Sequence, residues 1–176
     1  MRKAILVIHI FFCCFAFGQQ KIAIIKENKI RLVVDTVKLK KYVKYYLFPD
    51  SDKISIDKVE IRKQKMLMSE KEYFMILFHD FENEVKIAKW LSLKGKKLIM
   101  KNNLKENDLF EAVFLTCSGS EDCFPNIFEM DGSRNWTCGE LTMHLGEEQI
   151  RDTGCIISRS LFPKNFKPSQ TPYNTR

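Results

Sequence analysis

Hydrophobic and polar positions follow two different periods in the first part of the chain. Two β-branched runs, residues 21–26 and 29–34, flank the polar pair Glu27-Asn28, which is the pattern of a short β-hairpin. Asp35 can then cap a helix, because apolar residues recur after it at intervals of three and four. These apolar residues are Leu39, Tyr42, Val43, Tyr46 and Leu47. The pattern predicts a hairpin followed by one amphipathic helix that ends before a proline at position 49.

The residues after that helix alternate in the manner of strands. Ile54 and Ile56 alternate with polar residues, and Val59 and Ile61 do so with the opposite parity. Since one extra residue reverses which face a strand presents, the change of parity predicts a bulge or break near residue 57.

Three later segments complete the predicted sheet. Residues 73–78 form an unbroken apolar run, typical of a central strand covered on both faces. Apolar and polar residues alternate over residues 84–93 as in a strand, but some of the apolar residues also recur at the three-residue interval of a helix. The pattern therefore allows both a strand and a helix. We favour a strand, because the lysine-glycine pair at 94–95 can turn the chain into residues 97–101 as a hairpin would. Residues 109–117 are apolar at almost every position.

The order of these elements predicts an α+β fold. One amphipathic helix packs on a curled antiparallel sheet, made of the N-terminal hairpin and a meander of about four or five strands. A loop-rich C-terminal segment held by disulfides follows. The order resembles the helix-then-meander arrangement of cystatin-like folds in architecture only, which implies no function. The chain has no Gln-x-Val-x-Gly segment of the kind that marks cystatin inhibitors.

Length and composition agree with a single globular domain. The chain has 176 residues, of which 45% are hydrophobic and 29% charged, and this excludes a collagen or a wholly disordered protein. We expect one domain over residues 19–160, with a cysteine-rich segment at 117–155. Residues 161–176 hold three prolines among polar residues and are expected to form a flexible tail.

The first eighteen residues have the layout of a secretory signal peptide. Residues 1–3 carry two positive side chains, and residues 4–17 are uncharged and mostly apolar. Ala16 and Gly18 provide the small residues that signal peptidase accepts, so we expect the mature chain to begin at Gln19. This predicts a secreted or periplasmic protein.

Two alternatives to cleavage involve the membrane. A retained anchor would need roughly 20 apolar residues to span a bilayer, more than the leader contains, so we expect no transmembrane helix in the mature chain. A lipid anchor would use Cys13 or Cys14, but neither follows the leucine and small-residue pattern of such sites.

The expected mature chain retains four cysteines, Cys117, Cys123, Cys138 and Cys155. An even number in an exported chain predicts two disulfides, and the spacing leaves all three pairings open. The alternative is a zinc site with His144 as a further ligand. Its weakness is that no two cysteines are separated by two to four residues, the spacing that presents two thiolates to one ion.

Charge divides the chain into two unlike parts. The net charge is +7, yet residues 19–108 carry 21 basic and 13 acidic side chains while residues 109–176 carry 6 and 9. Three of the lysines, Lys38, Lys41 and Lys44, lie on the polar face of the predicted helix. We interpret most of this excess as a solvated surface that aids solubility. Attraction to an acidic partner or to lipid head groups is the alternative, whereas nucleic acid is not an expected partner of an exported protein.

Candidate catalytic residues are few. Only His79 and His144 remain in the expected mature chain, and His79 stands beside Asp80 at the end of the most apolar strand. Because adjacent strand residues point to opposite faces, we expect a solvent-facing pair at a strand end rather than an acid–base pair. The sequence contains no G-x-S-x-G elbow, no phosphate-binding glycine loop and no HExxH motif.

The methionines Met66, Met68 and Met75 could serve a soft metal such as Cu(I) through their thioethers. We expect them to fill the core instead, with the sulfurs of the first two on one buried face of a strand. We therefore predict no metal and no cofactor.

The aromatic residues of the cysteine-rich segment are the candidate recognition site. Phe124, Phe128 and Trp136 lie between cysteines, where disulfides would fix the loops that carry them. We therefore expect a non-catalytic binding module of the bacterial envelope or the extracellular space, with a protein or glycan partner. A carboxylate-dependent hydrolase of envelope glycan and a purely structural envelope component are the alternatives. The sequence does not indicate an oligomeric state.

Overall fold

The computed structural model describes residues 19–102, 109–139 and 154–161. The strands are β1 (Gln19–Lys26), β2 (Lys29–Leu32), β3 (Lys58–Lys65), β4 (Glu72–Asp80), β5 (Val85–Lys94), β6 (Lys97–Lys101), β7 (Val113–Ser118), β8 (Pro125–Met130), β9 (Ser133–Cys138) and β10 (Ile156–Leu161). The helices are α1 (Thr36–Leu47) and α2 (Leu109–Ala112). The expected signal peptide and residues 162–176 of the expected tail lie outside the described residues, whereas Leu161 belongs to β10 and not to a tail.

The N-terminal hairpin and the helix follow the sequence pattern. Lys26 of β1 pairs with Lys29 of β2 across the predicted two-residue turn, in which Glu27 and Asn28 both have positive φ, at 52° and 60°. The Asp35 carboxylate caps α1 by accepting hydrogen bonds from two backbone N–H groups of its first turn, at 3.0 and 3.1 Å. Both predictions are confirmed.

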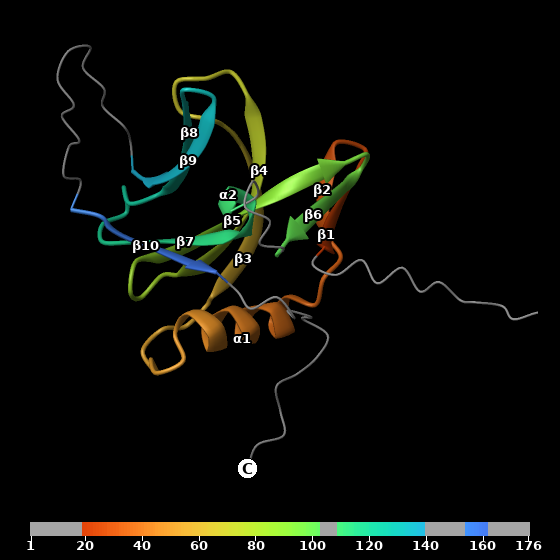
Figure 1. Ribbon diagram of the computed structural model, residues 1–176. Coiled ribbons are helices and arrows are strands. Elements are labelled where there is room, and N and C mark those ends of the chain that lie inside the picture. Colours follow the sequence, from red (N-terminus) through yellow and green to blue (C-terminus); the bar gives the residue numbers. More distant parts are fainter. Residues whose placement is uncertain (1–18, 103–108, 140–153, 162–176) are drawn as a thin grey trace, which may run out of the picture.

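A central strand, β5, holds the main sheet together. One edge of β5 pairs with β4 over its first seven residues. The other edge pairs with β7 over residues 85–89 and then with β6 over residues 92–94, so the sheet forks. The segment predicted at 84–93 is thus a strand, Val85–Lys94, and not a helix, as favoured. The eight-stranded antiparallel sheet is curled; β10 and β2 end the two arms of the fork, and β3 forms the remaining edge beyond β4 (Figure 1).

The strand count exceeds the expected number because the cysteine-rich segment contains a hairpin and a further strand follows it. The hairpin forms a second, two-stranded sheet, β8–β9, and β10, directly after the segment, joins the main sheet beside β7. The β8–β9 hairpin turns at Asp131 and Gly132, both with positive φ. The prediction of an α+β fold with one long helix and a curled antiparallel sheet is confirmed, while the cysteine-rich segment contains a hairpin that was not predicted.

The main sheet has a core on each face. Alternate residues of β4, Phe74, Ile76 and Phe78, pack with α1 residues in the first core, which we call the helix face. The residues between them, Tyr73, Met75 and Leu77, pack with the β8–β9 hairpin in the second core, the hairpin face. This explains the unbroken apolar run, since both sides of β4 are buried. Figure 1 shows α1 and the β8–β9 hairpin at opposite ends of the curled sheet.

Met66 and Met68 do not share a buried face. Met66 is buried on the hairpin face, but Met68 is 71% exposed and has a φ of 59°. The prediction failed because β3 ends at Lys65, so strand alternation no longer holds at these two residues.

Two disulfides fasten the hairpin face. Cys117 of β7 is bonded to Cys138 of β9, and Cys123 is bonded to Cys155 immediately before β10. Gly119 is required beside the second bond, because a Cβ there would lie 2.9 Å from the Cys123 sulfur. All four thiols are oxidised, which leaves the zinc alternative without thiolate ligands. His144 lies outside the described residues.

Within the part of the chain that the structure describes, no helix is long and apolar enough to cross a membrane.

Candidate functional site

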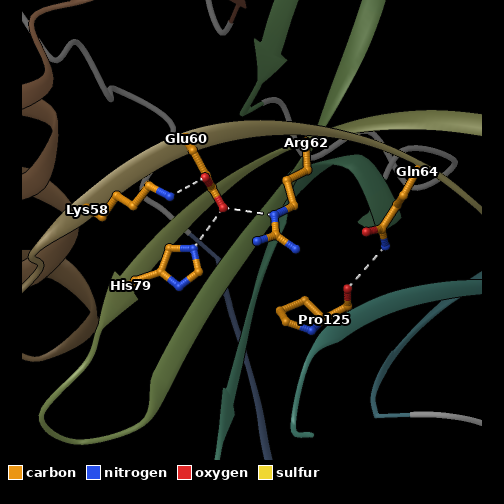
Figure 2. Close-up of polar contacts among 6 residues, drawn as sticks. All are labelled: Lys58, Glu60, Arg62, Gln64, His79 and Pro125. Atoms are coloured by element: carbon orange, nitrogen blue, oxygen red, sulfur yellow. Dashed lines mark hydrogen bonds and ion pairs between the residues drawn. The ribbon is translucent and has the colours of Figure 1, made fainter. Parts of the chain in front are cut away.

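Four polar side chains of β3 point to the hairpin face of the sheet. They alternate with Val59 and Ile61, which pack on the helix face. The four are Lys58, Glu60, Arg62 and Gln64, which we call the β3 row. Figure 2 shows them hanging from one side of the strand, with His79 of β4 and Pro125 of β8 facing them.

Glu60 is the centre of the β3 row. Its carboxylate accepts hydrogen bonds from Lys58 Nζ at 2.6 Å, from Arg62 Nε at 2.8 Å and from His79 Nε2 at 3.1 Å. Partial burial favours the neutral acid, but the three donors outweigh it and hold the pKa of Glu60 at about 2. Glu60 is therefore ionised at neutral pH, and since it can only accept, His79 Nε2 carries the proton between them.

His79 is buried, contrary to the sequence prediction. It is 7% exposed and Asp80 is 2% exposed, so neither faces solvent. As expected, the two point to opposite faces: Asp80 accepts backbone N–H bonds from Ser55 and Asn83 and so fixes the segments on either side of it. The carboxylate that reaches His79 is Glu60, brought there by the pairing of β3 with β4.

The surroundings of His79 keep its ring neutral at pH 7. Burial lowers the pKa of His79, and the positive charges of Arg62 and Lys58 lower it further, while the hydrogen bond to Glu60 opposes both. Lys86 of β5 lies directly across from it on the other side. The Nδ1 atom makes no hydrogen bond within the described residues, and the ring stacks on Phe81 with centroids 5.3 Å apart.

Arg62 and Gln64 join the β3 row to the cysteine-rich segment. The Arg62 guanidinium carbon lies 4.7 Å from the centre of the Phe124 ring. Gln64 Nε2 donates to the backbone oxygen of Pro125 at 3.4 Å and to the side-chain oxygen of Asn126 at 3.1 Å (Figure 2). The row and the start of β8 therefore form one continuous surface.

The three aromatic residues predicted for recognition have different environments. Trp136 is 3% exposed, stacks on Phe110 and donates its indole N–H to the Phe110 backbone oxygen at 3.2 Å, so it belongs to the core of the hairpin face. Phe128 is half-buried and forms a β-bridge with Leu67. Phe124, also half-buried, is the one in contact with Arg62.

A second charged cluster fills the fork of the sheet. Lys89 is fully buried, and its Nζ donates to the backbone oxygens of Glu111 at 3.0 Å and Ala112 at 2.7 Å, where β6 and β7 separate. Burial lowers the pKa of Lys89 to about 7, although the Glu111 charge opposes this. Its amine also lies 4.6 Å from the Phe114 ring centre. We interpret Lys89 as a structural donor for carbonyl groups that the fork leaves unpaired.

Glu111 balances this cluster. Its carboxylate contacts Lys101 at 2.5 Å, the Ser92 hydroxyl at 3.0 Å and Arg134 at 3.7 Å. Burial favours its neutral form, but these partners lower the pKa of Glu111 below its ordinary value. Glu60 and Glu111 both stay ionised, whereas a glycosidase requires one carboxylic acid with a raised pKa. Neither glutamate is therefore the acid with a raised pKa that this mechanism uses.

Sequence reasoning missed the two residues that organise these clusters. Glu60 could not be matched to His79 without the register of β3 against β4. The sequence did indicate that Lys89 is buried. Val85, Ile87 and Leu91 alternate on one face of the strand, and position 89 belongs to the same alternating series. A lysine in a buried series indicates a buried amine with partners.

Comparison with known proteins found no matching family model, no similar curated protein and no similar solved structure.

Proposed function

We propose that this chain is an exported, disulfide-stabilised protein that acts by binding, and that its partner engages the β3 row. The observation that carries the proposal is the position of Arg62, whose guanidinium lies between the Glu60 carboxylate and the Phe124 ring while its side chain stays 44% exposed. A guanidinium held by two neighbours loses little conformational entropy when it binds. Such a group is suited to recognition.

The disulfides support both the location and the site. Disulfides persist in oxidising compartments, in agreement with the predicted signal peptide. Phe124 directly follows Cys123, whose bond to Cys155 ties this loop to β10. Lys86 reaches the same loop through the backbone oxygens of Ser120, at 3.3 Å, and Glu121, at 3.0 Å. The second disulfide therefore helps to keep Phe124 beneath Arg62.

Binding is favoured over catalysis by the state of the titratable groups. Glu60 is ionised and fully engaged by three donors, and His79 is buried beneath Phe81. Neither group is placed to pass a proton directly to a substrate that lies on the surface. The partner we propose is a protein or a glycan of the envelope or the medium.

The test compares two neighbouring residues of β3. Residues 19–176 are immobilised and exposed to envelope and secreted extracts of the source organism. Arg62→Gln should lose the retained component, because it removes the cation from the β3 row. Lys63→Gln is the matched control, since Lys63 is 47% exposed, points to the other face and pairs with Glu72 at 2.5 Å. Equal retention by both variants would overturn the proposal. Trp136→Ala is a poor test, because it removes a core residue.

A further inference from the structure

On the basis of the proposed function, we propose that the β3 row binds the acidic groups of a polyanionic glycan, and that binding takes up a proton at His79.

The charge of the β3 row favours an anionic ligand. Lys58 and Arg62 contribute two positive charges and Glu60 one negative charge, which leaves +1 when His79 is neutral. The Lys58 and Arg62 side chains are 51% and 44% exposed. Arg62 uses Nε for Glu60, and its two terminal nitrogens make no hydrogen bond within the described residues. They present the paired donors that carboxylate and sulfate groups accept.

An exposed aromatic ring beside the row favours a glycan. Phe81 is 61% exposed and stacks on His79, whose cross-strand neighbours are Lys58 and Lys86. A ring in this position can pack against the apolar face of a sugar while the row holds the acidic substituents. A lipid surface would instead require several exposed apolar side chains that insert together with the cations. Phe81 is the exposed apolar side chain that the described contacts tie to this site.

His79 occupies a place where an added proton increases the positive charge beside the row. It lies between Lys58 and Lys86, its cross-strand neighbours on the two sides, with Glu60 at 3.1 Å. The charged groups that face it are Lys58, Glu60 and Arg62 from β3 and Lys86 from β5; the nearby loop adds the exposed Glu121 and Asp122. An imidazolium at this place would neutralise Glu60 directly.

Protonation of His79 therefore strengthens the site. While the ring is neutral, Lys58 and Arg62 share the Glu60 charge. Once the ring is charged, the row together with His79 carries +2, by one added proton, and both surface cations are available to the ligand. By linkage, a bound anion favours the imidazolium, so the affinity should rise as the pH falls.

The experiment uses residues 19–176 and three dextrans of one chain length: neutral dextran, carboxymethyl-dextran and dextran sulfate. Calorimetry should show binding of the two charged polymers and none of neutral dextran. Dextran sulfate, whose sulfates do not titrate, should bind roughly three-fold more tightly at about pH 5.5 than at about pH 8, the effect of one extra charge near the surface. Measurements in two buffers of different ionisation heat should reveal proton uptake.

Two variants separate the effect of proton uptake from the effect of anion binding. His79→Gln keeps a donor for Glu60 but cannot be protonated, so it should bind without proton uptake and with equal affinity at both pH values. Arg62→Gln should weaken binding at both pH values and leave their ratio unchanged. If His79→Gln does not fold, the His79 ring signals of the unaltered protein are titrated by NMR and assigned with His144→Gln. The pKa of His79 should rise when dextran sulfate is bound.

Each contrary result has a separate meaning. Binding of neutral dextran as tight as that of dextran sulfate would overturn the acidic-glycan assignment. Binding to phosphatidylglycerol vesicles without binding to dextran sulfate would overturn it in favour of a lipid surface. A pH ratio retained in His79→Gln, or an NMR titration unmoved by dextran sulfate, would overturn the proton coupling while the proposed binding function stands. Extract retention unaffected by Arg62→Gln would overturn the proposed function itself.

Discussion

The two faces of the sheet are closed in different ways. On the helix face, α1 packs through Leu39, Tyr42 and Val43, and its own sequence pattern specifies the buried stripe. On the hairpin face, β8–β9 packs through residues such as Ile127 and is bonded to β7 by a disulfide. A two-stranded hairpin is marginally stable alone, so a covalent tie is of greater use there. Both disulfides among the described residues lie at the hairpin face, so we expect reduction to loosen that face and not the helix face.

The difference can be measured because both tryptophans of the chain pack on the hairpin face. Trp136 belongs to that core and Trp90 packs against it. Tryptophan fluorescence therefore reports the hairpin face, while far-UV circular dichroism at 222 nm reports α1, which is the one long helix among the described residues.

The largest effect is expected from truncating the neighbours Ile76 and Leu77, which are both fully buried but point to opposite faces. Ile76→Ala and Leu77→Ala should each lower the free energy of unfolding by about 4 kcal/mol, from lost burial and an unfilled cavity. Urea unfolding measures both. Only Leu77→Ala should also shift the native tryptophan emission. If Ile76→Ala shifts it equally, the two cores are not separate.

Removing the disulfide of β7 and β9 should have the next largest effect. Cys117→Ala with Cys138→Ala should cost about 3 kcal/mol, because the bond closes a loop with a sequence separation of 21. Thermal unfolding of this variant should show tryptophan fluorescence changing at a lower temperature than the helical signal. Coincident transitions would contradict the view that the bond mainly serves the hairpin face.

Acid should weaken the β3 row through Glu60. The pKa of Glu60 is about 2 in the folded protein against an ordinary value of 4.5, so its contribution is present above pH 4.5 and is lost as the pH falls toward 2. The loss should amount to about 2 to 3 kcal/mol in the unaltered protein. Urea unfolding as a function of pH measures it. Glu60→Gln should show a shallower acid limb, and an unchanged limb would refute the assignment.

The most gradual effect belongs to Lys89 at the fork. Because its pKa is lowered to about 7 from 10.5, the unfolded chain binds more protons between these values, and stability should rise with pH from about 7 to about 9.5. The expected slope is about 1 kcal/mol per pH unit. Lys89→Met should abolish the slope, as measured by urea unfolding at several pH values. A slope retained in that variant would assign the effect to another group.

Sequence patterns predicted the elements that depend on residues close together in the sequence. Asp35 caps α1 and the Glu27-Asn28 turn closes the first hairpin, because each depends only on neighbouring residues. The Asp131-Gly132 pair of the β8–β9 hairpin is also typical of a hairpin turn. However, apolar and polar residues alternate too weakly on either side of it to predict strands. Residue type alone suggested the recognition residues Phe124, Phe128 and Trp136. Their burial in the structure then showed that Trp136 belongs to the core, whereas the two phenylalanines are half-buried.

The candidate site could not be predicted in the same way. Its contacts connect residues far apart in sequence: Glu60 with His79, and Arg62 with Phe124. They depend on strand register and on which cysteines pair, and the spacing left three pairings open. Hydrophobic periodicity specifies which face a residue occupies, but not which residue stands opposite it.

The central claim is that an anionic glycan binds the cations of the β3 row, which neighbouring side chains hold in place, in preference to the lysines of α1. The β3 row has two exposed cations, while the surface of α1 carries Lys38, Lys41 and Lys44. The most direct test is to add dextran sulfate to isotope-labelled residues 19–176 and map the amide shifts by NMR. The account predicts shifts centred on residues 58–64, with Phe81 and Phe124, and none centred on residues 36–47. Shifts centred on α1 would contradict it.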